Sequence, residues 1–111
     1  MTPYAIVMTT INSEEEGRRL ARTLVEAQLA ACVSIIPNVL SVYNWKGELQ
    51  EDREWLLLVK TRSDKAGAIR EHLDAHHPYE VPELVVLPIT EGGEPYLAWM
   101  EQSLRGSEIE N

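Results

Sequence analysis

Three apolar runs constrain the fold of this chain more than any other feature: "AIVM" at Ala5–Met8, "WLLLV" at Trp55–Val59 and "LVVL" at Leu84–Leu87. A strand with one face in water alternates apolar and polar residues, whereas a continuously apolar strand is buried on both faces. A chain of 111 residues has no spare layer for the second face. We therefore expect another copy to cover that face in a closed symmetric oligomer; the alternative is a monomer with differently packed helices.

Local signals place two helices between these strands. Ser13 and Glu16 form an S-x-x-E capping box, which predicts a helix start directly after the first strand. Ser63 or Asp64 is the expected N-cap of a second helix. Pro78 excludes the helical region for the residue before it, so we expect the second helix to end there or earlier.

The middle of the chain is typical of a hairpin. Residues 31–45 are extended in character, Lys46 and Gly47 form a turn, and residues 54–62 return as an apolar strand. Leu84–Ile89 is the expected fourth strand.

The resulting order βαββαβ predicts an α+β, ferredoxin-like fold, in which two helices cover one face of a four-stranded antiparallel sheet. We expect residues 1–105 to form one domain. Pro95–Ser103 is expected to be a short C-terminal helix, and residues 106–111 a frayed tail.

The net charge and the cysteine content restrict the kinds of partner and of metal site that this chain can have. The formal net charge is −8, which disfavours binding to nucleic acid. Cys32 is the only cysteine, so an intrachain disulfide and a cysteine-only zinc site are both excluded; we expect a buried, inert thiol. The first residues lack a basic leader, and no apolar run is long enough to span a membrane. We expect a cytoplasmic protein without a membrane partner.

Four stretches together resemble the CutA family of divalent-cation tolerance proteins: "LVEAQLAACVSIIPNVLSVYNWKGELQED", "LLLVKT", "HHPYEVPELVVLPI" and "GGEPYLAWMEQS". The resemblance implies a ferredoxin-like subunit in a stable homotrimer, related in architecture to the PII signalling proteins. It also implies binding of copper or another divalent cation, as in some members. Ser34 stands where the family commonly has Asn, and Met8 where some members have a metal-binding cysteine. We therefore expect weak metal binding and no organic cofactor.

The expected metal ligands are His76, His77 and Met8, with Glu80 as an alternative third ligand. Neutral imidazole is a common metal ligand, and a thioether suits copper(I). Pro78 favours a non-helical His77, which a chelate by adjacent histidines requires. The alternative is that His76 is a solvated helix-end residue and His77 a structural hydrogen-bonding residue.

A proline-stiffened segment follows the histidines. Pro78 and Pro82 restrict the chain around Tyr79, so this segment is expected to hold its side chains in one arrangement. We interpret it as one wall of a ligand pocket between subunits, with Glu80 and Glu83 as polar contacts. The alternative for Glu83 is a structural salt bridge or cap.

The large aromatic residues are further pocket candidates. Tyr43 and Trp45 alternate near the hairpin tip and share a face; the resemblance places that region beside a cleft between subunits. Trp99 is a weaker candidate, because ordinary core or interface packing is the favoured explanation for it. Lys60 ends an apolar strand and is expected to meet an anionic ligand or to pair with Glu83.

The sequence contains no G-x-S-x-G, H-E-x-x-H, Walker or dinucleotide-binding motif, so we do not expect an enzyme. We expect a cytoplasmic homotrimer that binds copper or another divalent metal, and a small ligand between subunits, in metal response or signalling. One alternative is a structural trimeric scaffold with incidental metal binding. Another is an uncharacterised enzyme that uses Tyr79, Glu80 and His77.

Overall fold

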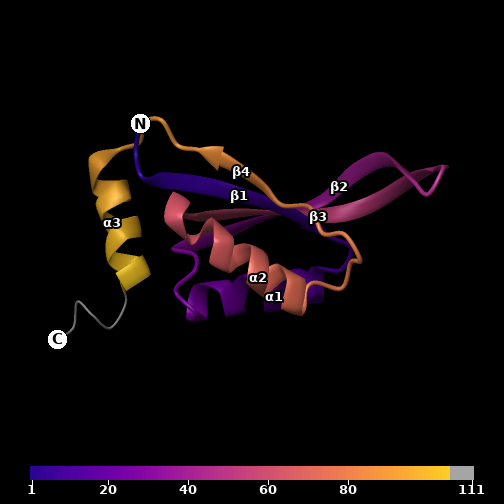
Figure 1. Ribbon diagram of the computed structural model, residues 1–111, viewed down its shortest axis with the longest axis horizontal. Coiled ribbons are helices and arrows are strands. Elements are labelled where there is room, and N and C mark those ends of the chain that lie inside the picture. Colours follow the sequence, from indigo (N-terminus) through magenta and orange to yellow (C-terminus); the bar gives the residue numbers. More distant parts are fainter. Residues whose placement is uncertain (106–111) are drawn as a thin grey trace.

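The chain follows the order βαββαβα in a computed structural model that describes residues 1–105. The elements are β1 (Tyr4–Ile11), α1 (Glu14–Glu26), β2 (Cys32–Trp45), β3 (Glu48–Arg62), a 3₁₀ turn η1 (Ser63–Lys65), α2 (Ala66–His76), β4 (Val85–Pro88) and α3 (Glu94–Arg105). The strands form one antiparallel sheet in the order β2-β3-β1-β4, with α1 and α2 on the same side (Figure 1). The predicted α+β order with a C-terminal helix is confirmed. The predicted tail, residues 106–111, lies outside the described residues.

The core lies between the sheet and the two helices. Val7 and Ile11 of β1 face it together with Leu57 and Val59 of β3, because residues two apart in a strand share a face. The helices contribute Leu20, Leu24, Ile69 and Leu73, all buried. Burial of each such side chain stabilises the fold by about 1.5–3 kcal/mol.

The two helix starts differ from one another. Ser13 caps α1 as predicted, since its Oγ accepts a hydrogen bond from the Glu16 backbone N–H at 3.3 Å. The predicted side-chain cap of the second helix is wrong: residues 63–65 form a 3₁₀ turn, and α2 begins at Ala66 without a side-chain cap. The backbone N–H of Ser63 instead donates to the Pro3 carbonyl at 2.8 Å, which continues the β1–β3 pairing.

Strands β2 and β3 extend far beyond the helices as a two-stranded hairpin arm, residues 39–53, which Figure 1 shows at the right. The turn at its tip has positive φ at Lys46 (52°) and Gly47 (85°), as hairpin turns that match the strand twist require. A register shift between Ile36 and Val39 bends β2 next to Pro37.

The sheet has an open face, which α1 and α2 leave uncovered. Its residues come from all four strands: Ile6, Met8 and Thr10; Cys32, Ser34 and Ile36; Leu56, Leu58 and Lys60; Val85 and Leu87. Most are apolar and all are at least partly accessible to solvent. The continuous apolar runs of the sequence thus arise because both faces of β1 and β3 are apolar.

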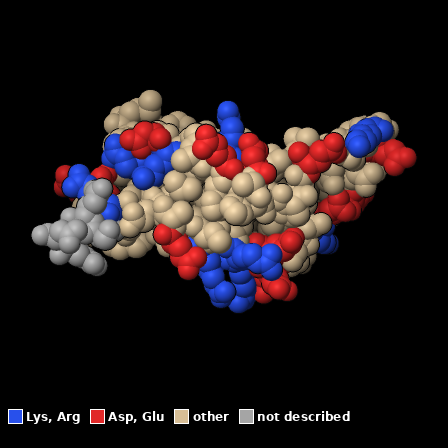
Figure 2. All heavy atoms as spheres, turned by 60° about the horizontal axis from the view of Figure 1, so that its bottom comes forward, with Lys and Arg blue, Asp and Glu red and all other residues tan. Residues whose placement is uncertain are grey.

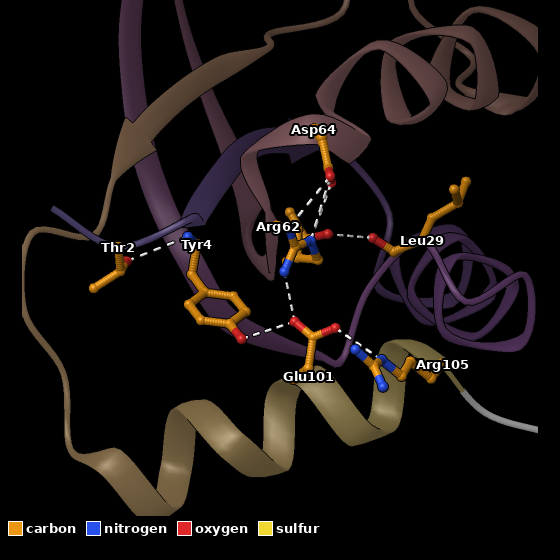
Figure 3. Close-up of polar contacts among 8 residues, drawn as sticks. Thr2, Tyr4, Leu29, Arg62, Asp64, Glu101 and Arg105 are labelled. Atoms are coloured by element: carbon orange, nitrogen blue, oxygen red, sulfur yellow. Dashed lines mark hydrogen bonds and ion pairs between the residues drawn. The ribbon is translucent and has the colours of Figure 1, made fainter. Parts of the chain in front are cut away.

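Helix α3 packs at the end of the sheet remote from the hairpin arm (Figure 1). Met100 and Leu104 are buried there against Tyr4. Glu101 joins the helix to the strands: Tyr4 Oη donates to it at 2.8 Å, and the Arg62 guanidinium pairs with the same carboxylate (Figure 3). The hydrogen bond from Tyr4 and those from the arginines lower the pKa of Glu101.

Candidate functional site: an acidic cleft at the base of the hairpin arm

A cleft of about 710 Å³ opens where the hairpin arm leaves the sheet. It is lined by Thr10 near the end of β1, by residues 41–43, Trp45 and Glu54 of the hairpin strands, and by the segment 79–83. We call it the acidic cleft, because Glu54, Glu80 and Glu83 contribute to its walls. Five residues predicted for a ligand pocket line this one cleft: Tyr43, Trp45, Tyr79, Glu80 and Glu83.

His77 fastens the proline-containing wall to the sheet. It is 8% exposed and leaves the helix with extended backbone angles (φ −82°, ψ 136°), as the following Pro78 requires. Its Nε2–H donates to the Thr10 carbonyl at 2.8 Å, and its Nδ1 accepts from the Tyr79 N–H at 3.1 Å. Both ring nitrogens are therefore occupied within the chain, in a structural hydrogen-bonding arrangement.

Glu54 is the most buried acid of the cleft, with 6% exposure. Tyr79 Oη donates to its carboxylate at 2.6 Å. Burial and this hydrogen bond raise the pKa of Tyr79 above its ordinary value, so the phenol stays protonated. Sequence reasoning missed Glu54 because it belongs to the charged run "EDRE", although it lies two residues before Leu56 and hence on the open face.

The charges of the cleft are unbalanced. Burial and the nearby negative charge of Glu54 raise the pKa of Glu83. No Lys or Arg of residues 1–105 forms an ion pair with Glu54 or Glu83. Lys46 pairs with Glu80 at 3.7 Å at the exposed rim. The arrangement therefore disfavours an anion and suits a positively charged ligand.

Aromatic groups complete the walls. Tyr43 donates a hydrogen bond to the Asp52 carboxylate, which raises the pKa of the Tyr43 phenol. Lys46 Nζ lies 5.5 Å from the centroid of the Trp45 ring, so this ring already faces a cation of the chain itself. Carboxylates beside aromatic faces are the groups that bind ammonium and guanidinium ions.

Two residues predicted for the pocket lie elsewhere. Lys60 is on the open face, where its Nζ donates to Ser34 Oγ at 2.9 Å and lies 3.9 Å from Cys32 Sγ. Trp99 is an exposed residue of α3, with its ring centroid 5.5 Å from that of Tyr96. Neither residue lines the cleft within one subunit.

The predicted metal ligands are not brought together within one subunit. Met8 lies on the open face, whereas His76 ends α2 on the other side of the sheet. Within residues 1–105, no group of three or more His, Cys, Asp or Glu side chains is placed to hold a metal ion. The ring of His76 instead contacts that of His72, a residue that sequence reasoning missed although the two are four apart in α2.

Basic and acidic side chains of residues 1–105 are intermixed on the face that Figure 2 shows. They lie next to one another in the lower part of that view and at the tip of the hairpin arm. Intrahelical pairs such as Glu14–Arg18, at 3.1 Å, account for part of this mixing. In the part of the chain that the structure describes, no helix is both long and apolar enough to cross a bilayer.

Comparison with known proteins identifies the family. Residues 5–103 match the family model described as CutA1 divalent ion tolerance protein. The divalent-cation tolerance protein CutA of Thermus thermophilus is 49% identical over 98 residues, which cover 88% of this chain and 95% of that protein. The chloroplastic CutA of Arabidopsis thaliana is 45% identical, and the matched part covers 93% of this chain but only 57% of the plant protein.

Solved structures agree with these matches. The structure of the Thermus thermophilus protein superposes with a TM-score of 0.84 at 49% identity, covering 87% of this chain and 94% of that one. CutA1 of Oryza sativa superposes with a TM-score of 0.90 at 44% identity, covering 96% and 97%. The chain therefore belongs to the CutA1 family of divalent ion tolerance proteins.

Proposed function

We propose that this protein is a homotrimeric cation-binding module that contributes to divalent-cation tolerance, and that the acidic cleft is its binding site. The observation that carries the proposal is the pair of carboxylates of Glu54 and Glu83, which face one cleft without an ion-pair partner among residues 1–105. Two negative charges in a poorly solvated site repel each other, and a bound cation relieves this repulsion.

The cleft favours a hydrated divalent ion or a small organic cation over a tightly chelated metal. The carboxylates of residues 1–105 do not converge as a set of three metal ligands, so a bare ion lacks an inner coordination shell there. Tyr43 and Trp45 add aromatic faces, which attract ammonium and guanidinium groups. The shared chemistry of the ligand is therefore positive charge, and binding rather than catalysis is the proposed activity.

The open face supports self-assembly. Leu56 and Leu58 lie in the same row of β3 as Glu54, so the apolar surface is continuous with the floor of the cleft. An apolar face of this kind is stable in water only when another surface covers it. A second and third copy supply that cover in a closed ring and also close the cleft from outside.

Copper binding at His76, His77 and Met8 stays a prediction. His77 has both ring nitrogens in hydrogen bonds, so a metal at this ring must displace either Thr10 or Tyr79. Met8 and Cys32 both lie on the open face, which is the face proposed for self-assembly. Thiolate and thioether sulfur are ligands suited to copper(I).

Titration calorimetry on the full chain tests the cleft. The titrants are magnesium chloride, as a hydrated divalent ion, and agmatine, as an organic cation; the proteins are wild type, Glu54→Gln and the exposed arm control Glu48→Gln. Glu54→Gln keeps the shape and the acceptor for Tyr79 but removes the charge, so we expect at least one titrant to bind tenfold more weakly or worse. The control should bind as wild type does.

Light scattering on the same samples tests assembly, with three subunits expected for all three proteins. Equal affinity of wild type and Glu54→Gln for both titrants contradicts the cation site. A trimer that binds neither titrant favours the scaffold alternative, whereas a monomer contradicts the assembly proposal.

A further inference from the structure

The two histidines on the outer part of α2 lie outside the acidic cleft and outside the open face. His72 and His76 are four residues apart, so they sit on one side of the helix a single turn from each other. Their ring centroids are 4.4 Å apart, with the planes inclined by 42°. Two histidines in this spacing on a helix are a known bidentate arrangement for a transition-metal ion.

The hydrogen bonds of His72 leave one specific nitrogen free. Thr23 Oγ1 donates its proton to the Leu20 carbonyl at 2.9 Å, so towards the ring it acts as an acceptor. The His72 Nε2, at 2.8 Å from this oxygen, must therefore carry the ring proton. Nδ1 of His72 then holds the lone pair that a metal ion requires.

This arrangement resembles the support that metal-binding histidines commonly have. A ligating imidazole usually donates its other N–H to a fixed acceptor, which sets the tautomer and the ring orientation. Here Thr23 of α1 is that acceptor. His76 has no side-chain hydrogen bond within residues 1–105 and is exposed at the helix end, so its ring is free to turn.

The spacing of the rings fits a single ion. With metal–nitrogen distances of about 2.0–2.1 Å, two ligating nitrogens lie about 3 Å apart. The ring centroids of His72 and His76 are 4.4 Å apart, so a shared ion requires the exposed His76 ring to turn towards His72 while Thr23 holds the His72 ring. Imidazole pairs suit copper(II), nickel(II) and zinc(II), and copper(II) binds most tightly in this series.

We infer that His72 and His76 form a surface site for copper(II) or a similar divalent transition metal on α2, with Thr23 as the orienting residue and water completing the coordination. The site lies on the helical side of the sheet, which assembly through the open face leaves accessible. This inference is independent of the acidic cleft. It assigns the ligands to His72 and His76, which share one face of α2, in place of the adjacent pair His76 and His77.

The experiment removes one histidine in one variant and changes histidine geometry at constant histidine number in another. Copper(II) chloride is titrated into the full chain as wild type, as His72→Gln and as the double variant Asp74→His/His76→Ala, which moves the second imidazole to a position two residues from the first. Wild type is expected to bind at least tenfold more tightly than either variant, because residues two apart on a helix point to different sides. Circular dichroism checks that all three remain folded.

Electron paramagnetic resonance of the copper(II) complexes gives the second readout. Two equatorial imidazole nitrogens are expected in wild type and one in the double variant. Glu54→Gln, which alters the acidic cleft, should keep both the affinity and the two-nitrogen spectrum of this site. Equal binding by wild type and the double variant, or a single-imidazole wild-type spectrum, overturns the inference.

Thr23→Val sharpens the test, because it keeps the side-chain shape but removes the acceptor for the His72 ring. We expect about tenfold weaker copper(II) binding with the two-nitrogen spectrum retained, as for other second-layer residues around metal ligands. An unchanged affinity would refute the orienting role of Thr23.

Discussion

The same pair of strands behaves differently in two regions of the molecule. In the helix-covered base, Leu57 and Val59 of β3 are fully buried, at 0% exposure. In the hairpin arm, Val42 and Leu49 are exposed by 58% and 73%. The base completes its own core, whereas the arm carries apolar side chains that the rest of the described chain does not cover. The first region contributes most of the stability, and the second is expected to contribute little to it.

The largest expected effect is a loss of stability caused by a substitution in the helix-covered base. Leu57→Ala removes a fully buried side chain between the sheet and both helices, and should lower the free energy of unfolding by about 2–5 kcal/mol. Leu49→Ala on the arm is the matched control and should change it by less than about 0.5 kcal/mol. Urea denaturation measures both. Equal losses would show that the arm is as tightly packed as the base.

The next largest effect on stability is expected where the hairpin arm joins the base. Tyr79→Phe removes the hydrogen bond to the buried Glu54 carboxylate and should cost about 1–3 kcal/mol of unfolding free energy. Tyr43→Phe removes a similar bond to Asp52 in the exposed arm and should cost much less, because water there can replace the lost bond. A larger loss for Tyr43→Phe in thermal unfolding would contradict the difference in burial.

Substitution of two glycines, one in each region, is expected to change stability in opposite directions, because the backbone conformations at the two positions differ. Gly47 at the tip of the arm has a φ of 85°, so Gly47→Ala should destabilise by about 1–2 kcal/mol. Gly67 lies in α2, and an added Cβ there meets nothing within 4 Å. Gly67→Ala should therefore stabilise by about 0.5–1 kcal/mol through helix propensity. Calorimetric melting of both variants checks the opposite signs.

The smallest effect is a difference in pH dependence. The pKa of Glu101 is lowered by hydrogen bonds from Tyr4 and Arg62, so its contribution to stability is present at neutral pH and is lost as pH falls through the folded-state pKa. The pKa of Glu83 is raised by burial and by Glu54, so its ionised form destabilises at neutral pH and protonation removes that cost.

Denaturation midpoints between pH 7 and pH 3 test the two signs. Glu101→Gln should reduce the loss of stability in acid, because the variant has no carboxylate to protonate. Glu83→Gln should remove the small gain expected on mild acidification, which begins at higher pH than the loss at Glu101. If both variants and wild type had parallel pH profiles, the opposite shifts in the pKa values of Glu101 and Glu83 would be contradicted.

The order of the elements was predictable because its signals are local. Lys46 and Gly47 mark the hairpin turn, and Pro78 ends α2 at the residue before His77. The cap of α2 was not predictable in the same way. Ser63 uses its backbone N–H for Pro3, a residue remote in sequence.

The candidate site was partly predictable for the same reason. Tyr79, Glu80 and Glu83 belong to one short segment, so their common location follows from the chain itself. Glu54 lies near them only because of the pairing register of the sheet, which the charged sequence "EDRE" does not reveal. Lys60 ends an apolar run, but a strand end alone does not fix what its side chain meets, and its ammonium group contacts Ser34 across the open face.

The link between Tyr4 and Glu101 has a consequence for how the protein is made. These side chains are separated by 97 residues, so the bond between them forms only after α3 has left the ribosome. The β2–β3 hairpin closes through neighbours such as Trp45 and Glu48 and is available much earlier. We expect nascent chains that end before α3 to hold the hairpin while Tyr4 still lacks its partner. In this order of assembly, the final step of folding joins the two ends of the described chain.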